Sequence, residues 1–271
     1  MLTVKPYTTV LNQNNAYWMA KLAKLAYTRH SDQDHRPDEA AILDTLKLED
    51  ENFNQVRGYS HNSSQAILVE HKDFLCMAFR GTDELHDWFD NVNAFSQKVL
   101  FGEFHRGFWA ALNDIWDGIF EDFVKAKKQS SRSLFITGHS LGGAMATIAA
   151  ARLLHDDLHF SSVYTFGQPR VVEKHTARLF NVECKERFFR FQNNNDLVTR
   201  VPSRLMGYSH VGSYYYISEE KKIFNDPGFW FRFLDCVDGA LESAVEKGID
   251  GIEDHDMNHY LEAVQSWHCE F

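Results

Sequence analysis

The stretch Gly138-His139-Ser140-Leu141-Gly142 places one serine between two glycines, where an apolar run meets a run of small residues. Residues 134–137 have the composition of a short strand, and residues 143–154 that of a buried helix. A tight strand-to-helix turn needs residues without bulk beside the serine, and it displays the hydroxyl at the sheet edge. The pattern predicts that Ser140 is a nucleophile and that the Leu141 amide stabilises a negative oxygen. The alternative is a glycine-rich turn with an inactive serine.

A serine hydroxyl needs a base to take its proton and an acid to orient that base. Asp196 follows the apolar run 187–191 in a polar loop, from which a carboxylate could reach a histidine at the same sheet edge. Four histidines follow it in the chain: His210, His255, His259 and His268. His255 precedes the last predicted helix in a loop, the kind of position that carries catalytic groups in such folds. The residues alone leave the choice among the four open.

The elements that must position these residues can be read from apolar patterning. Strand-like runs occur at 66–69, 74–79, 134–137, 162–166, 187–191 and 214–217. Helical patterns occur at 17–27, 108–127, 143–154 and 176–181, and two more follow at 230–246 and 257–267. The first two strands, joined by four polar residues, are expected to form a hairpin. Strands that alternate with helices predict an α/β fold, with a largely parallel sheet covered by helices on both faces, and the length suits one domain over 1–271.

The overall charge excludes some functions. Lys and Arg number 28 against 38 Asp and Glu, which gives a net charge of −10 and disfavours nucleic acid as a partner. No stretch approaches the ~20 apolar residues of a membrane span. The first residues lack the pattern of a secretory signal, and the four cysteines are scattered rather than arranged as a disulfide framework. These observations lead to the expectation of a cytoplasmic protein.

Several short motifs occur in a fixed order along most of the chain. They are AFRGT (78–82), HRGF (105–108), TGHSLGGA (137–144), YTFGQPRV (164–171), NNNDLVTRVP (193–202), GYSHVG (207–212) and DHDMNHYL (254–261). In these motifs the sequence resembles the fungal-type, or class 3, triacylglycerol lipases. The resemblance implies the α/β-hydrolase fold.

Carried over position by position, the resemblance implies Ser140 as nucleophile, Asp196 as orienting acid and His255 as base. It places the oxyanion donor that follows Phe-Arg-Gly on Thr82, with the Leu141 amide as the second donor. It further implies a lipid or ester substrate at a lipid–water interface and no cofactor. The oligomeric state is not indicated.

Two further segments are of interest. Residues 83–95 carry apolar side chains, among them Leu85, Trp88 and Phe89, at helical spacing with acidic residues between them, which predicts an amphipathic helix. It is either a fixed surface helix or, as the resemblance implies, a lid over Ser140. The insert 218–251 matches no family motif.

Other functions compete with an acylglycerol lipase. Phospholipase A1 and short-chain esterase activity remain open within the same family. His255 and His259 have the H-x-x-x-H spacing of zinc hydrolases, although the usual Glu is replaced by Asp256 and no third ligand is evident. A non-catalytic acyl-binding protein of the same fold is the last alternative, because a fold does not imply a function.

Overall fold

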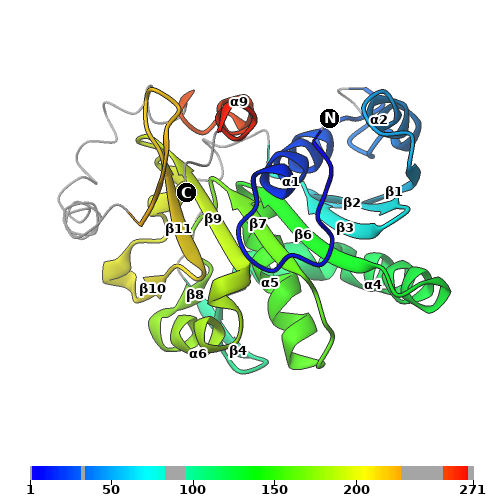
Figure 1. The fold of residues 1–271 in the computed structure, drawn as a ribbon. Helices are drawn as coiled ribbons and strands as arrows, with labels where there is room; N and C mark the ends of the chain where they lie inside the picture. Colours follow the sequence, from blue (N-terminus) through cyan, green and yellow to red (C-terminus); the bar gives the residue numbers. More distant parts are fainter. Residues whose placement is uncertain (1, 32–33, 83–94, 227–252, 268–271) are drawn as a thin grey trace.

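The computed structural model describes residues 2–31, 34–82, 95–226 and 253–267. Its centre is an eight-stranded sheet in the order β1-β2-β3-β6-β7-β9-β11-β12 (Figure 1). The strands are β1 (Phe53–His61), β2 (Ser64–His71), β3 (Phe74–Phe79), β6 (Ser133–His139), β7 (Ser162–Phe166), β9 (Phe188–Asn193), β11 (Ser213–Ile217) and β12 (Ile223–Asn225). The five strands from β3 to β11 run parallel, whereas β1, β2 and β12 pair antiparallel at the two edges.

The parallel strands are buried on both faces, which explains why they appear in the sequence as continuous apolar runs. In β6, Leu134 and Ile136 face one core and Phe135 faces the other. The expected hairpin is confirmed, because β2 and β3 pair antiparallel. The expected α/β fold with a largely parallel sheet is therefore confirmed.

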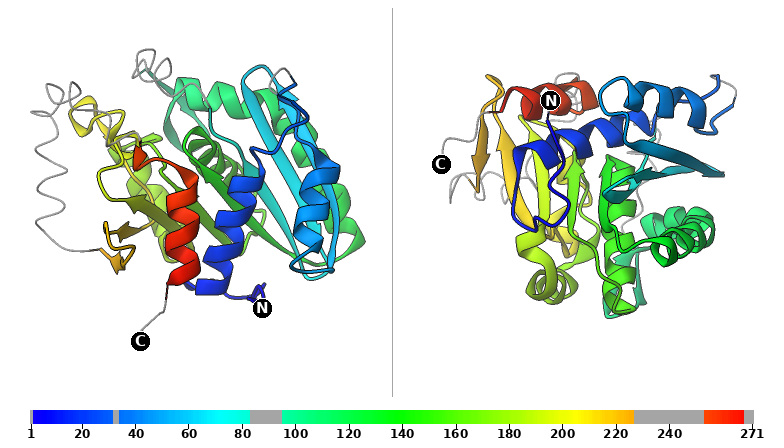
Figure 2. Two further views of the ribbon diagram at one scale, coloured as in Figure 1. Left: turned by 90° about the horizontal axis from the view of Figure 1, so that it is seen from above. Right: turned by 45° about the vertical axis from the view of Figure 1, so that its right-hand side comes forward.

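Helices cover both faces of the sheet (Figure 2). One face carries α1 (Gln13–Leu25) and α9 (Met257–Ser266), which lie side by side. The other face carries α4 (Arg106–Gln129), α5 (Leu141–His155) and α6 (Lys174–Cys184). The short helix α2 (Glu39–Lys47) lies against β1.

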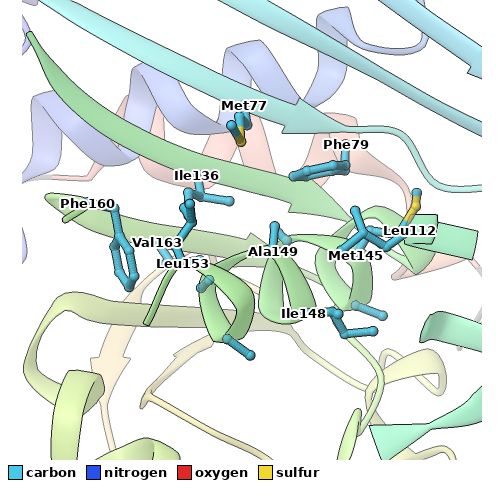
Figure 3. Packing of buried hydrophobic residues seen from close by; sticks show 14 of the residues in the cluster. Met77, Phe79, Leu112, Ile136, Met145, Ile148, Ala149, Leu153, Phe160 and Val163 are labelled. Atoms are coloured by element: carbon cyan, nitrogen blue, oxygen red, sulfur yellow. The ribbon is translucent and has the colours of Figure 1, made fainter. Parts of the chain in front are cut away.

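Helix α5 is the most deeply buried of these helices, since its small residues allow close approach to the sheet. Ala149 faces the strands, while Met145, Ile148 and Leu153 fill the space toward α4 and the flanking strands (Figure 3). Close packing fixes the start of α5 against the end of β6. The turn that carries Ser140 is thus held by two buried elements.

Some elements were not expected from the sequence. Strand β1 has a mixed polar and apolar pattern typical of an edge strand. A second, antiparallel sheet joins β4 (Ser96–Val99), β5 (Gly102–His105), β8 (Val172–Glu173) and β10 (Tyr208–Ser209), all too short to show a period.

Of the insert 218–251 only residues 218–226 are described, and they supply β12. The predicted helix 230–246 lies outside the described residues. None of the helices in the described part of the chain is long and apolar enough to span a bilayer.

Candidate active site

Ser140 lies between the end of β6 and the start of α5, as the glycine-flanked pattern predicts. Its backbone has φ 59° and ψ −129°, a conformation that residues other than glycine rarely adopt. Its N–H donates to the carbonyl of Phe166 at 2.9 Å, which ties the turn to the end of the neighbouring strand β7. Such strain is characteristic of a turn that displays a nucleophile above a sheet edge.

The two glycines of the turn are required for steric reasons. A side chain at Gly138 would collide with the backbone of Gly142, and one at Gly142 would collide with the carbonyl of Phe79 in the adjacent strand β3. The serine is therefore held in a turn whose backbone segments are in van der Waals contact. A larger residue at either glycine would force the strand and the helix apart.

Asp196 lies in the turn after β9 and is fully buried. Its Oδ2 is 2.8 Å from Nδ1 of His255 and accepts a hydrogen bond from the Tyr260 hydroxyl at 2.5 Å. Its Oδ1 accepts from the Val198 N–H at 2.9 Å. Three donors thus meet one carboxylate, which compensates its removal from water. Burial and the neighbouring Asp196 carboxylate raise the pKa of Tyr260 well above its ordinary value, so the phenol stays protonated and donates.

His255 lies in the turn before α9 and is 1% exposed. Nδ1 of its ring faces Asp196, and Nε2 is buried without a hydrogen-bond partner among the described residues. The Ser140 hydroxyl is likewise buried and unbonded within the described part of the chain. The ring of His139, directly before Ser140, lies 4.4 Å from the His255 ring, centroid to centroid. Asp196 and His255 are therefore in direct contact, and the residue that precedes Ser140 lies against the His255 ring.

Gly167 is one of two residues of the site that the local sequence pattern does not indicate. It has φ 59°, and a side chain there would overlap both the His255 ring and the Asp196 carboxylate. It directly follows Phe166, whose carbonyl accepts the Ser140 N–H. Tyr260 was also missed as a partner of Asp196, because that contact joins residues 64 positions apart. The sequence signal for these two residues is that Gly167 lies in the motif YTFGQPRV and Tyr260 in the motif DHDMNHYL.

The predicted oxyanion donors flank Ser140. Gly81, at the end of β3, packs so closely on Ser140 that an added Cβ would lie 2.8 Å from the serine Cβ. Thr82 is the next residue and is partly buried. Leu141 is the first residue of α5, where helical amides lack partners within the helix. Leu141 thus follows the serine in the chain, and Thr82 follows the glycine that packs on it.

The other histidines are placed differently. His259 lies on α9 and His255 precedes that helix, so the pair does not share one helical face as the zinc hypothesis requires. Within the described ranges no group of three metal-ligating side chains occurs. The Nε2–H of His210 donates to the carbonyl of Thr199 at 2.8 Å, a packing role. His268 and the predicted lid residues Leu85, Trp88 and Phe89 lie outside the described residues.

Comparison with known proteins identifies relatives of this chain. A secreted mono- and diacylglycerol lipase A of Penicillium cyclopium is 30% identical over 159 residues, covering 56% of this chain and 51% of the relative. A secreted mono- and diacylglycerol lipase of Malassezia globosa is 30% identical over 187 residues, covering 64% and 61%. The chain thus spans about half to three fifths of the length of these relatives.

The expectation of a cytoplasmic protein is wrong, because these relatives are named as secreted lipases. That expectation rested on the first residues of the sequence and on the scattered cysteines.

The fold has solved counterparts. The structure of a triacylglycerol lipase described as having a serine-protease triad at its catalytic centre aligns with a TM-score of 0.62 at 22% identity. The alignment covers 75% of this chain and 79% of that lipase, which establishes the α/β-hydrolase fold of fungal lipases. Residues 76–206, which include the Ser140 turn and Asp196, match the family model of the lipases (class 3). With the ordered motifs and the relatives above, this match shows that residues 76–206 are similar to the class 3 lipases.

Proposed function

We propose that this chain is a carboxylic ester hydrolase of the lipase type that works through an acyl-enzyme intermediate. The observation that carries the proposal is the buried Asp196–His255 pair beside the strained turn of Ser140. Among the described residues neither the Ser140 hydroxyl nor Nε2 of His255 has a hydrogen-bond partner, although buried polar groups are normally bonded. Nucleophile and base positions that await a substrate account for both.

In the first half-reaction, the Ser140 hydroxyl oxygen attacks the ester carbonyl carbon while Nε2 of His255 accepts its proton. Asp196 accepts the Nδ1–H of His255 and stabilises the imidazolium that forms. The Thr82 and Leu141 amides donate to the carbonyl oxygen as it becomes negative. Collapse of the tetrahedral species breaks the ester bond, and the imidazolium protonates the departing alcohol.

In the second half-reaction, water takes the place of the alcohol. His255 removes a proton from the water, whose oxygen attacks the acyl-serine carbonyl carbon. The same two amides stabilise the second oxyanion. Its collapse releases the carboxylic acid, and the proton returns to the Ser140 oxygen.

The substrate class that fits best is an acylglycerol ester presented at a lipid–water interface. The relatives are named as mono- and diacylglycerol lipases, and we extend that substrate class and an extracellular location to this chain. Phospholipase A1 and short-chain esterase activity use the same three residues and differ only in the groups around them. No metal or other cofactor enters these steps.

The test is an ester series that runs from short p-nitrophenyl esters to emulsified mono-, di- and triacylglycerol and phospholipid. The wild-type chain is expected to favour acylglycerols, and Ser140→Ala should lower kcat by roughly 10⁴- to 10⁶-fold. A fluorophosphonate should label Ser140 in the wild-type chain alone. Substantial turnover by a folded Ser140→Ala protein would overturn the mechanism, and no turnover or labelling of the wild type would favour a non-catalytic acyl-binding protein.

A further inference from the structure

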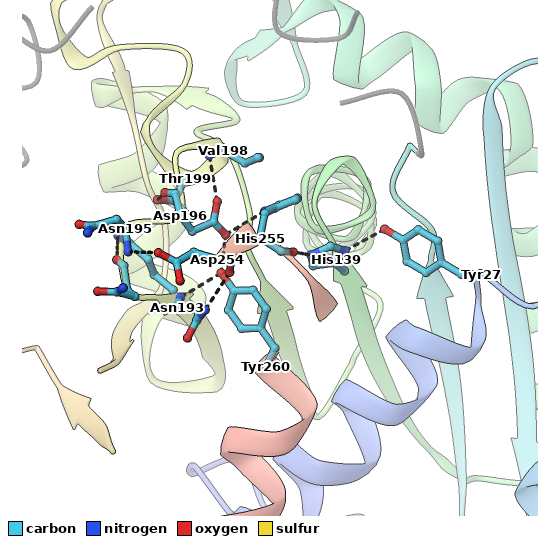
Figure 4. A network of polar contacts seen from close by, with 12 residues as sticks. Tyr27, His139, Asn193, Asn195, Asp196, Val198, Thr199, Asp254, His255 and Tyr260 are labelled. Atoms are coloured by element: carbon cyan, nitrogen blue, oxygen red, sulfur yellow. Dashed lines mark hydrogen bonds and ion pairs between the residues drawn. The ribbon is translucent and has the colours of Figure 1, made fainter. Parts of the chain in front are cut away.

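His139 is a buried residue, 5% exposed, whose two ring nitrogens are both hydrogen-bonded. Nε2 lies 2.7 Å from the backbone carbonyl oxygen of His255, and Nδ1 lies 2.8 Å from the hydroxyl of Tyr27. Figure 4 shows the imidazole of His139 between Tyr27 on one side and His255 on the other. The mechanism proposed above assigns no role to either His139 or Tyr27.

The direction of each hydrogen bond follows from the chemistry of the partners. A carbonyl oxygen only accepts, so Nε2 of His139 carries the proton and donates to His255. Nδ1 is then an acceptor, and the Tyr27 hydroxyl donates to it. The Gly81 N–H in turn donates to the Tyr27 oxygen at 3.1 Å. Burial, followed by the neighbouring His255 imidazole, lowers the pKa of His139 well below its ordinary value, which keeps the ring neutral as this arrangement requires.

The resulting chain of three hydrogen bonds joins segments that are far apart in the sequence. Tyr27 follows α1, Gly81 follows β3 and precedes the oxyanion residue Thr82, and His139 ends β6 immediately before Ser140. The chain ends on the backbone of the base. The nucleophile, the oxyanion loop and the base are thus tied together by contacts that do not involve the reacting atoms.

His255 is anchored from two independent sides. Asp196 bonds its ring at Nδ1 and fixes the ring orientation, whereas His139 bonds its backbone carbonyl and fixes the position from which the ring projects. A misplacement of about 1 Å is enough to cost ~100-fold in rate, so the backbone anchor matters for turnover.

We propose that Tyr27 and His139 are positioning residues that hold the His255 backbone and the Gly81–Thr82 loop in register with Ser140. This inference rests on the proposed ester hydrolysis. Because the hydrogen bonds of the two residues reach backbone atoms of His255 and Gly81 and leave Nε2 of His255 and the Ser140 hydroxyl untouched, their loss is expected to lower kcat and leave KM nearly unchanged. If the two residues only filled space, their substitution would instead lower thermal stability and activity together.

The two hydrogen bonds of the His139 ring can be broken separately. In His139→Asn the side-chain amide lies where Nδ1 was, so the bond with Tyr27 is kept and the bond to His255 is lost. In His139→Gln the amide reaches the Nε2 position, so the bond to His255 is kept and the Tyr27 bond is lost. Tyr27→Phe removes the bond that His139→Gln removes, together with the acceptor for the Gly81 N–H.

The experiment measures kcat and KM on a soluble ester for Tyr27→Phe, His139→Asn, His139→Gln and the double variant Tyr27→Phe/His139→Gln. Active sites are counted by fluorophosphonate titration, and thermal melting checks that each variant is folded. Each single variant should lose roughly 10- to 100-fold in kcat with KM within about twofold. The double variant should match Tyr27→Phe alone, because the shared bond is already absent. The matched control is Tyr59→Phe, a substitution on the edge strand β1 that removes a hydroxyl bonded to Asp122 of α4, and it should keep wild-type kcat.

Three results would overturn the proposal: unchanged kcat in Tyr27→Phe and His139→Asn, losses confined to KM, or losses that multiply in the double variant. Ser140→Ala, measured in the same assay, separates this failure from failure of the proposed function. If the wild type hydrolyses the ester and Ser140→Ala does not, the hydrolase proposal stands whatever the activity of the Tyr27 and His139 variants.

Discussion

At the scale of single residues, the carboxylate of Asp196 and the imidazole of His255 meet against a backbone position that has no side chain. Gly167 adopts φ 59° there, and any Cβ would lie 2.7 Å from a His255 ring carbon and 2.8 Å from the Asp196 oxygen. The absence of a side chain at Gly167 therefore sets how closely the acid and the base approach the end of β7. Gly207 provides a comparison, since it has φ 90° and a Cβ added there would meet no atom within 4 Å.

We expect Gly167→Ala to lower kcat/KM by at least about 100-fold, because the new methyl group displaces His255. Gly207→Ala should keep near-wild-type activity. Both substitutions carry the backbone penalty of about 1–2 kcal/mol for a positive φ, so urea unfolding should show a loss of stability in each. Equal activity in the two variants would show that the contact at Gly167 does not control the site.

The choice between two histidines four positions apart is also tested at this scale. His255→Ala should remove turnover by roughly 10⁴- to 10⁶-fold, since the base is lost. His259→Ala, on α9 and away from Asp196, should reduce activity less than about tenfold through packing. A chelator should leave the wild-type rate unchanged. Loss of activity in chelator together with an inactive His259→Ala would favour the zinc alternative.

Residue types and spacing pointed to Ser140 through its glycine-flanked turn, whereas the polar loop of Asp196 also reads as a plain turn and needed the family motifs. The assignment of His255 needed family motifs, since four histidines follow Asp196. Tyr260 and Gly167 are defined by contacts across the fold. Their roles follow from which atoms meet at one sheet edge, which no local pattern encodes.

At the scale of elements, the buried parallel strands were predictable because burial on both faces produces continuous apolar runs. Strand β1 has no continuous apolar run, because one side of an edge strand is polar. Strands β4, β5, β8 and β10 are too short for a period to appear. Helix α5 begins at Leu141, two residues before its predicted start, since Gly142 and Gly143 are weak helix formers held by packing.

The segment 83–95 stays a prediction at this scale, as 83–94 lie outside the described residues. The resemblance to class 3 lipases implies a lid that covers Ser140 in water and turns toward lipid at an interface, which would remove the cost of exposing Trp88 to water; the alternative is a fixed surface helix. The rate on a partly soluble ester should then rise abruptly at its solubility limit, and Trp88→Ser should lose the rise. A smooth saturation curve would indicate a fixed helix.

At the scale of the whole molecule, neutral buried histidines link folding to pH. Burial lowers the pKa of His139 and of His210 well below 6.5. The unfolded chain therefore binds protons that the folded chain does not as the pH falls below that value, and stability declines with it. The stability contribution is complete above pH 6.5 and is lost progressively below it.

We expect the free energy of unfolding, measured in urea, to fall as the pH drops below about 6.5, with a slope that approaches about 1.4 kcal/mol per pH unit for each such histidine. His139→Gln removes one titrating group and should make the decline shallower by that amount. This window lies above the ordinary titration range of carboxylates, which keeps the two effects separate. An identical slope in the variant and the wild type would contradict the assignment of a neutral His139.

Helices α1 and α9 lie side by side on one face of the sheet, although they are formed from residues near 13–25 and 257–266 (Figures 1 and 2). During synthesis the ribosome releases α1 long before α9, with an interval on the order of 10 to 50 s at ordinary elongation rates. Through that interval the apolar side of α1 that packs on α9 has no native cover. The nascent chain is therefore expected to present a site for chaperones at α1, and Tyr260, which anchors Asp196, arrives only with α9. Hydrolytic activity should accordingly appear only after α9 has been synthesised.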